Sequence, residues 1–145
     1  MINMPSLRLG DLVCRTPIVQ GGMGVGISLS RLASAVANQG GIGVISSVGL
    51  GMLRSKGSSG QADCAVLSDE IRKAREQTDG VLGVNIMVAL SNFSDMVETA
   101  IREKIDVVFS GAGLPLDLPK YLAEGAKTKL VPIISSGRAA AILCR

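Results

Sequence analysis

Four glycines fall within six positions, directly after a short apolar run, in the stretch IVQGGMGVGI at residues 18–27. Because glycine lacks a Cβ, the main chain at such a corner can approach a flat ring or a phosphate closely and point N–H groups at it. Small-residue turns also follow later apolar runs, at 46–49, 110–113 and 135–137. Such corners at the carboxyl ends of parallel strands predict a ligand site. The simpler alternative is a tight turn with close helix packing.

Two common phosphate-binding motifs do not fit these glycines. A GxGxxG motif that includes Gly22 and Gly24 would need glycine at position 27, where the chain has Ile27. No acidic residue follows about 20 positions later to hold a ribose. The GxxxxGK[ST] motif is absent too, because Ser55 precedes Lys56. Neither a dinucleotide fingerprint nor a P-loop is therefore expected.

Other reactive side chains are scarce. The chain has no histidine, which removes the usual general base near neutral pH and the commonest metal ligand. We therefore discount metal sites and histidine-assisted nucleophiles. Cys14, Cys64 and Cys144 are odd in number and far apart, which predicts reduced, partly buried thiols.

Composition limits the class of protein. The 145 residues suffice for one modest domain, and 47% are hydrophobic but only 2% aromatic, so the core must be aliphatic. A net charge of +3 without a basic cluster argues against nucleic-acid binding. No apolar run approaches the roughly 20 residues that span a bilayer, and the first residues lack a signal-peptide core. We expect a cytoplasmic protein with no membrane partner.

Apolar runs alternate with amphipathic stretches along the chain. After a hairpin that turns at Gly10-Asp11, we expect strands over 18–20, 42–46, 81–88, 106–113 and 129–135. Between them we expect helices up to residue 37, over 66–80, 93–103 and 119–126, and one beginning at 137. Ser28 or Ser30 should cap the first helix. The charges of 66–80 should form a solvated face, and 49–65 a mobile loop.

This alternation predicts an α/β fold with a parallel sheet buried on both faces. A doubly wound sheet and a (β/α)8 barrel both fit it. A complete barrel needs about 250 residues. The sequence therefore indicates an N-terminal portion of a TIM barrel, with about five βα units.

Four segments carry a family resemblance: PIVQGGMGVGISLSRLASAVANQGGIGVIS, GVNIMVAL, VFSGAGLP and KLVPIISS, in that order. They resemble the nitronate monooxygenase family, formerly called 2-nitropropane dioxygenases, and the related FMN-dependent enoyl-acyl-carrier-protein reductases. The resemblance covers nearly the whole chain and is weakest over 51–63. It implies an FMN enzyme on a (β/α)8 barrel.

The resemblance also assigns residues to the cofactor site. The loop after the first strand would lie along the flavin ring system, which concerns Gly21, Gly22, Met23 and Gly24. Asn85 would meet the pyrimidine edge or the ribityl chain, since a carboxamide both donates and accepts hydrogen bonds. An asparagine inside an apolar strand also needs partners, because a buried amide without them costs a few kcal/mol.

Further assignments come from later loops. The turn after the fourth strand would pass close to the flavin or line the substrate pocket, which concerns Ser110, Gly111, Ala112 and Gly113. Lys129 would offer charge to the reduced flavin. Ser135 and Ser136 would hydrogen-bond the ligand.

The sequence departs from the family in one respect. The catalytic histidine of the Gly-Gly-His segment and the phosphate-binding loop follow the fifth strand in the family, and the sequence stops at Arg145 before either. No catalytic residue is therefore assigned. We expect residues 1–145 to be an incomplete FMN-binding barrel domain that is inactive or nearly so by itself.

The implied activity is oxidation of nitronates with O2. The alternatives are reduction of an unsaturated acyl thioester with NAD(P)H as co-substrate, and a non-catalytic half-barrel that forms homo-oligomers through its open strand edges. A barrel like that of inosine-monophosphate dehydrogenase fits the glycine-rich corner less well.

Overall fold

A computed structural model describes residues 4–53 and 60–144. Its strands are β1 (Leu7–Leu9), β2 (Leu12–Cys14), β3 (Gly43–Ser46), β4 (Leu82–Met87), β5 (Val107–Gly111) and β6 (Lys129–Pro132). Its α-helices are α1 (Ser30–Asn38), α2 (Gly60–Arg75), α3 (Phe93–Arg102) and α4 (Gly137–Leu143). Two 3-10 helices, η1 (Leu50–Leu53) and η2 (Leu118–Tyr121), complete the described elements.

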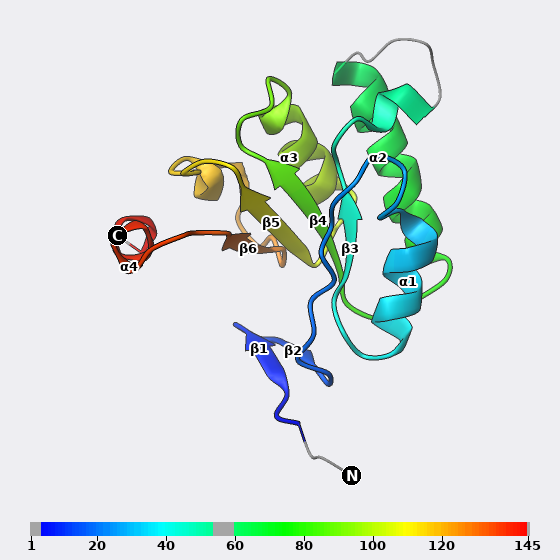
Figure 1. Ribbon diagram of the computed structural model, residues 1–145, viewed down its shortest axis with the longest axis horizontal. Coiled ribbons are helices and arrows are strands. Elements are labelled where there is room, and N and C mark those ends of the chain that lie inside the picture. The colour runs from blue at the N-terminus through cyan, green and yellow to red at the C-terminus, as the bar shows by residue number, and fades with distance from the viewer. Residues whose placement is uncertain (1–3, 54–59, 145) are drawn as a thin grey trace.

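The central sheet is parallel, and its strand order follows the sequence: β3, β4, β5, β6. A parallel bridge between Val19 and Ile42 adds residues 18–20 beside β3. In Figure 1, α1, α2 and α3 lie along one side of this sheet. A doubly wound sheet would reverse its strand order and carry helices on both faces. The sequential order on one side therefore identifies a partial (β/α)8 barrel.

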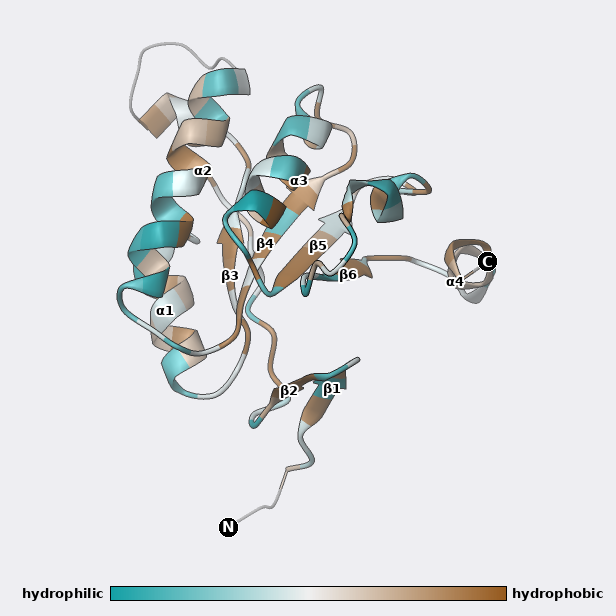
Figure 2. Cartoon of the chain, turned by 180° about the vertical axis from the view of Figure 1, so that it is seen from behind, coloured by the Kyte–Doolittle hydropathy of each residue, from teal (hydrophilic) through white to brown (hydrophobic). Residues whose placement is uncertain are grey.

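Two hydrophobic clusters lie on the two faces of the sheet. One joins strand residues such as Ile45, Val84 and Val108 to the buried sides of the helices. The other lies on the concave face, where Val107 and Phe109 pack with the β1–β2 hairpin. Side chains alternate between faces along each strand, which explains why adjacent residues of β5 belong to different clusters. Figure 2 shows brown strands behind helices whose outer sides are largely teal.

Close packing of α1 on β3 depends on a glycine. A Cβ at Gly43 would lie 1.8 Å from the carbonyl oxygen of Ala33, so no side chain fits there. None of the helices in the described part of the chain combines the length and apolarity that a membrane crossing needs. The three cysteines are free, and burial raises the pKa of the Cys14 thiol.

Several expected boundaries are wrong. The loop expected over 49–65 contains η1 and the first turns of α2, and its residues 54–59 lie outside the described residues. The helix expected over 119–126 is only the short η2, and Gly125 beyond it has a φ of +83° that no α-helix accommodates. The strand expected over 129–135 ends at Pro132, although Ile133 N still donates to the carbonyl oxygen of Ser110 at 2.7 Å.

The start of α1 corrects two further expectations. Its N-cap is Leu29, and neither Ser28 nor Ser30 caps it with a side chain. Instead the carboxylate of Glu70, on α2, accepts hydrogen bonds from Ser30 N (3.1 Å) and Ser30 Oγ (2.6 Å). Glu70 is buried, although we expected it on a solvated face. A carboxylate at a helix start is favoured by the unpaired N–H groups and the helix dipole.

We predict that Glu70→Gln lowers the free energy of unfolding by about 1–2 kcal/mol, because a charge-assisted cap becomes a neutral one. Urea denaturation at pH 7 measures this loss. Glu98→Gln is the control, since Glu98 is exposed on α3. An equally large loss of unfolding free energy in Glu98→Gln would contradict the role of Glu70 as a cap of α1.

The same cap predicts a pH dependence. Burial alone would raise the pKa of Glu70, but hydrogen bonds from Ser30 and Lys73 outweigh it and hold the pKa below its usual value. Stabilisation by Glu70 is therefore complete above the unfolded pKa of about 4.3 and declines as the pH falls through the lower folded pKa. Glu70→Gln should flatten the stability profile in that acidic range.

Candidate functional site

The glycines after residues 18–20 are required for different reasons. A Cβ at Gly22 would lie 2.4 Å from Val44 Cγ1 and 3.0 Å from Asn85 Cβ, so Gly22 rests directly on the sheet. Gly24 and Gly26 have φ values of +86° and +73°, in the left-handed region that favours glycine. A Cβ at Gly21 would meet nothing within 4 Å. Among these four glycines, only Gly21 has empty space where a side chain would begin.

Asn85 connects this corner to the middle of the sheet. It lies on β4, in register with Ser46 of β3 and Phe109 of β5. Its Nδ2 donates to the carbonyl oxygen of Gly22 at 2.9 Å and lies 3.7 Å from Met23 Sδ. Because a carbonyl only accepts, this contact fixes which end of the amide points at the loop.

The other end of the Asn85 amide is unsatisfied. Its Oδ1 is buried and has no hydrogen-bond partner among the described residues. A buried acceptor left unpaired costs about 1–3 kcal/mol. A ligand or water that donates a hydrogen bond to this oxygen would remove the cost.

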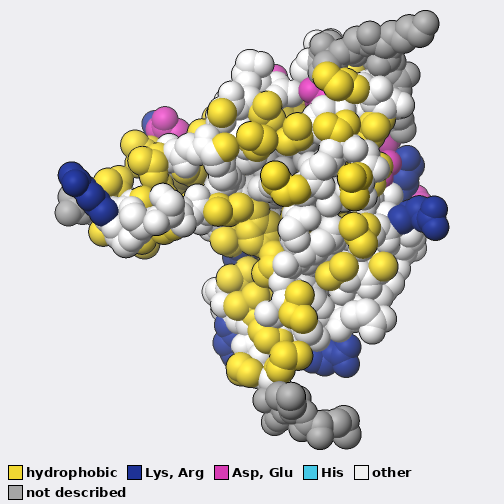
Figure 3. Space-filling view, in the orientation of Figure 1, with side chains coloured by type: hydrophobic (Ala, Val, Ile, Leu, Met, Phe, Trp, Pro, Cys, Tyr) yellow, Lys and Arg dark blue, Asp and Glu magenta, His cyan; other side chains and the backbone are white. Residues whose placement is uncertain are grey.

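A hollow of about 360 Å³ lies at this place. Its lining combines the glycine corner with the concave face of the sheet: Val19, Gln20, Gly21, Gly22, Met23, Val44, Asn85, Phe109, Val131 and Ile133. Met23 and Ile133 are exposed, at 65% and 55%. Figure 3 shows hydrophobic side chains spread over this side of the molecule above the hairpin. The site is thus a mostly apolar hollow with one convergent polar group, as small-molecule sites are.

The turn after β5 lines a second hollow, of about 750 Å³. Ala112 and Gly113 lie there with Ser135 and Ser136, and Ile133 borders both hollows. Ala112 has a φ of +58°, unusual for a residue with a side chain, and a Cβ at Gly113 would lie 2.8 Å from Val88 Cβ. This turn is therefore held tightly in its shape.

Ser110, Gly111 and Ser136 were also assigned to the ligand site, but none of them lines the first hollow. Ser110 follows Phe109, so alternation places its hydroxyl on the helix-covered face, where it is buried without a partner among the described residues. The carbonyl oxygen of Gly111 accepts from Val88 N at 2.8 Å. Ser136 is used locally, because its Oγ accepts from Ala139 N at the start of α4.

Lys129 lies apart from the other predicted site residues. It begins β6, at the opposite end of the sheet from the glycine corner, and pairs with Asp11 of the hairpin turn. The structure thus does not bring Lys129 together with the other predicted site residues, and its role toward a flavin stays a prediction.

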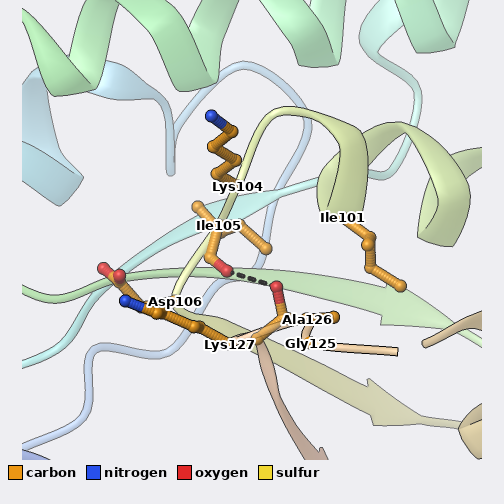
Figure 4. Close-up of a pocket in the computed structure, with 8 residues that line it drawn as sticks. Ile101, Lys104, Ile105, Asp106, Gly125, Ala126 and Lys127 are labelled. Atoms are coloured by element: carbon orange, nitrogen blue, oxygen red, sulfur yellow. Dashed lines mark hydrogen bonds between the residues drawn. The ribbon is translucent and has the colours of Figure 1, made fainter. Parts of the chain in front are cut away.

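A third hollow, of about 460 Å³, also lies at the amino ends of the strands. Figure 4 shows Lys104 pointing away from its centre and the hydrogen bond from Thr128 Oγ1 to the carbonyl oxygen of Ile105, at 2.7 Å. Ligands of parallel barrels bind at the carboxyl ends, so this hollow is not the candidate site.

Three polar residues at or beside the hollow were not assigned a role individually from the sequence, although 46–49 was among the turns expected at this edge. Gln20 lines the first hollow, and the buried hydroxyls of Ser46 and Ser47 have no partner among the described residues. Gln20 is the last residue of the segment 18–20, Ser46 is the last residue of β3, and Ser47 follows it. A polar residue at the carboxyl end of an apolar run is the sequence signal that could have identified them.

The chain matches the model of one protein family, described as nitronate monooxygenase, over residues 7–144. A curated relative is the Mycobacterium tuberculosis protein named (3aS,4S,5R,7aS)-5-hydroxy-7a-methyl-1-oxo-octahydro-1H-indene-4-carboxyl-CoA dehydrogenase. It is 32% identical over 122 residues, which are 84% of this chain and 30% of that protein.

Solved structures agree with this match. FabK from Thermotoga maritima superposes with a TM-score of 0.70 at 32% identity, over 91% of this chain and 38% of FabK. Nitroalkane oxidase from Streptomyces ansochromogenes superposes with a TM-score of 0.70 at 18% identity, over 90% of this chain and 43% of the oxidase. That likeness shows the fold alone. The chain thus spans less than half the length of these proteins, and it belongs to the nitronate monooxygenase family.

Proposed function

We propose that this chain provides the flavin-contacting part of an FMN-dependent oxidoreductase that oxidises nitronates with O2. The observation that carries the proposal is the unpartnered Oδ1 of Asn85, buried beside the main chain of Gly21 and Gly22. A planar cofactor with N–H groups at its edge suits both features. Membership of the nitronate monooxygenase family supports the same choice.

The residues present fit a flavin in four ways. The open space over Gly21 leaves main chain for a ring to lie on. The Oδ1 of Asn85 would accept from a ring N–H, while its Nδ2 keeps the loop in place. The exposed thioether of Met23 offers a polarisable contact to the ring system. Val44 and Phe109 form an apolar wall that excludes water from the inner side of the hollow.

FMN, when bound, would supply the electron-transfer chemistry, and the protein would supply position and shielding. We assign no catalytic base to this chain. The turn at Ala112 and Gly113 and the strand end at Ser135 would border the substrate, because the second hollow meets the first at Ile133.

A thioester oxidoreductase that uses NAD(P)H is the second candidate. The name of the M. tuberculosis relative describes a dehydrogenase of a carboxyl-CoA compound. With FMN-loaded protein, O2 uptake with an alkyl nitronate would support the first candidate. NAD(P)H oxidation with a 2-enoyl thioester would support the second. A cytoplasmic location and self-association through the strand edges stay predictions.

The direct test of the proposal is cofactor binding. FMN mixed with the chain should co-elute on gel filtration and lose fluorescence, because the hollow takes the ring system out of water. A folded chain, shown by circular dichroism, that elutes colourless would contradict the proposal. A colourless dimer would favour the non-catalytic half-barrel.

We predict that Gly21→Ala separates binding from folding. Because a Cβ there meets no protein atom within 4 Å, the free energy of unfolding should change by less than about 0.5 kcal/mol. Flavin affinity should fall about tenfold, since the methyl group occupies the ring's place. Urea denaturation and a fluorescence titration measure the two effects. Unchanged affinity would show that no ligand lies over Gly21.

Asn85→Leu gives a second prediction. It removes an unpaired buried acceptor together with one hydrogen bond, so stability should change by only about 1 kcal/mol. Flavin affinity should fall at least about tenfold, the value of one buried hydrogen bond. Asn38→Leu is the matched control, because Asn38 also donates to a main-chain carbonyl, that of Gln77, but lies outside the site.

A further inference from the structure

The segment of residues 18–20, which bridges to Ile42 beside β3, ends at Gln20 in an unusual way. Its main-chain ladder with β3 consists of two hydrogen bonds, from Ile42 N to Ile18 O (2.9 Å) and from Gln20 N to Ile42 O (3.0 Å). In a continuing parallel ladder, Val44 N would next donate to Gln20 O, and Gly22 N would donate to Val44 O. Neither bond is formed among the described residues.

The side chain of Gln20 makes both bonds in their place. Val44 N donates to Gln20 Oε1 at 3.2 Å, and Gln20 Nε2 donates to the carbonyl oxygen of Val44 at 3.0 Å. A carboxamide has the same donor and acceptor as a peptide group, so it can stand in for one. The N–H and the C=O of Val44, which is buried, thus both have hydrogen-bond partners, although the main chain of residues 20–22 supplies neither.

Because the Gln20 side chain takes the place of the main chain in the ladder, the main chain at the glycine corner is not hydrogen-bonded to Val44. The carbonyl oxygen of Gly22 turns to Asn85 Nδ2 instead of continuing the ladder. The N–H groups of Gly21 and Gly22 donate to nothing in the described part of the chain. On the far side, Ser28 Oγ contacts the carbonyl oxygens of Gly21 (3.3 Å) and Met23 (2.9 Å), which holds the released segment in place.

We propose that Gln20 is the positioning residue of the site: its carboxamide replaces one rung of the sheet so that the Gly21–Gly22 main chain becomes ligand-binding surface. This inference rests on the proposed flavin-binding function. Gln20 acts through Val44 and the glycines. It differs in this from Asn85, whose unpartnered oxygen faces the ligand directly.

The test compares three variants of the chain. Gln20→Met keeps the length of the side chain without its hydrogen bonds, and Gln20→Glu keeps the acceptor for Val44 N but loses the donor. Gln39→Met is the control, since the hydrogen bonds of Gln39 within the described residues involve its main chain only. Hydrogen exchange of the Val44 amide, followed by NMR without ligand, reports the rung itself. FMN titration and the visible spectrum of bound FMN report whether the Gly21–Gly22 main chain still binds the ligand.

We expect Gln20→Met to speed Val44 exchange and to weaken FMN binding about tenfold or more, with a shifted flavin spectrum. Gln20→Glu should fall between Gln20→Met and the unchanged protein, and Gln39→Met should match the latter. If hydrogen exchange of the Val44 amide were unchanged in Gln20→Met, the inference that the Gln20 carboxamide replaces a rung of the sheet would be overturned. Faster exchange with unchanged FMN affinity and spectrum would overturn the positioning role.

Failure of the proposed function looks different. In that case the unchanged protein itself would not bind FMN, while Val44 exchange would still respond to Gln20→Met. That outcome would overturn the flavin-binding role of the released main chain and leave the carboxamide rung as a structural feature.

Discussion

The candidate site depends on the hydrogen bond from Asn85 Nδ2 to the carbonyl oxygen of Gly22, which ties the glycine corner to β4. This bond links residues 63 positions apart, and it exists only because the strands are parallel and ordered as in the sequence. The parallel direction brings the carboxyl ends of β3, β4, β5 and β6 to one edge of the sheet. The bond also orients the amide, which leaves Oδ1 as the one Asn85 group without a partner.

Much of the fold was predictable because its signals are local. Apolar runs, glycine corners and the Gly10-Asp11 turn predict β3 to β6 and the hairpin, and the structure confirms these. The strand expected over 18–20 is reduced to an isolated bridge between Val19 and Ile42. The choice between a doubly wound sheet and a barrel needed the strand order, which no local pattern contains. The cap of α1 was missed for a similar reason, because Glu70 comes from a different helix, 40 residues away.

The site was predictable in part. Composition marks the glycine corner, and an asparagine inside an apolar strand marks Asn85. The sequence does not show that Lys129 lies at the amino end of its strand, away from the glycine corner. Nor does it show that the Ser110 hydroxyl lies on the helix-covered face of the sheet. Nor does it show that the Gln20 side chain substitutes for peptide groups, since that depends on the geometry between two strands.

The hairpin under the barrel has a consequence for the order of folding. The helix-side core forms between neighbouring βα units, whereas the concave core requires Leu7–Cys14 to meet Val107 and Phe109, about a hundred residues later. Closing such a long loop carries a large entropic cost and slows assembly. We therefore expect the outer layer to assemble early and the concave layer to close last. The ligand-facing surface would then be completed in the final step by which the chain reaches its native state.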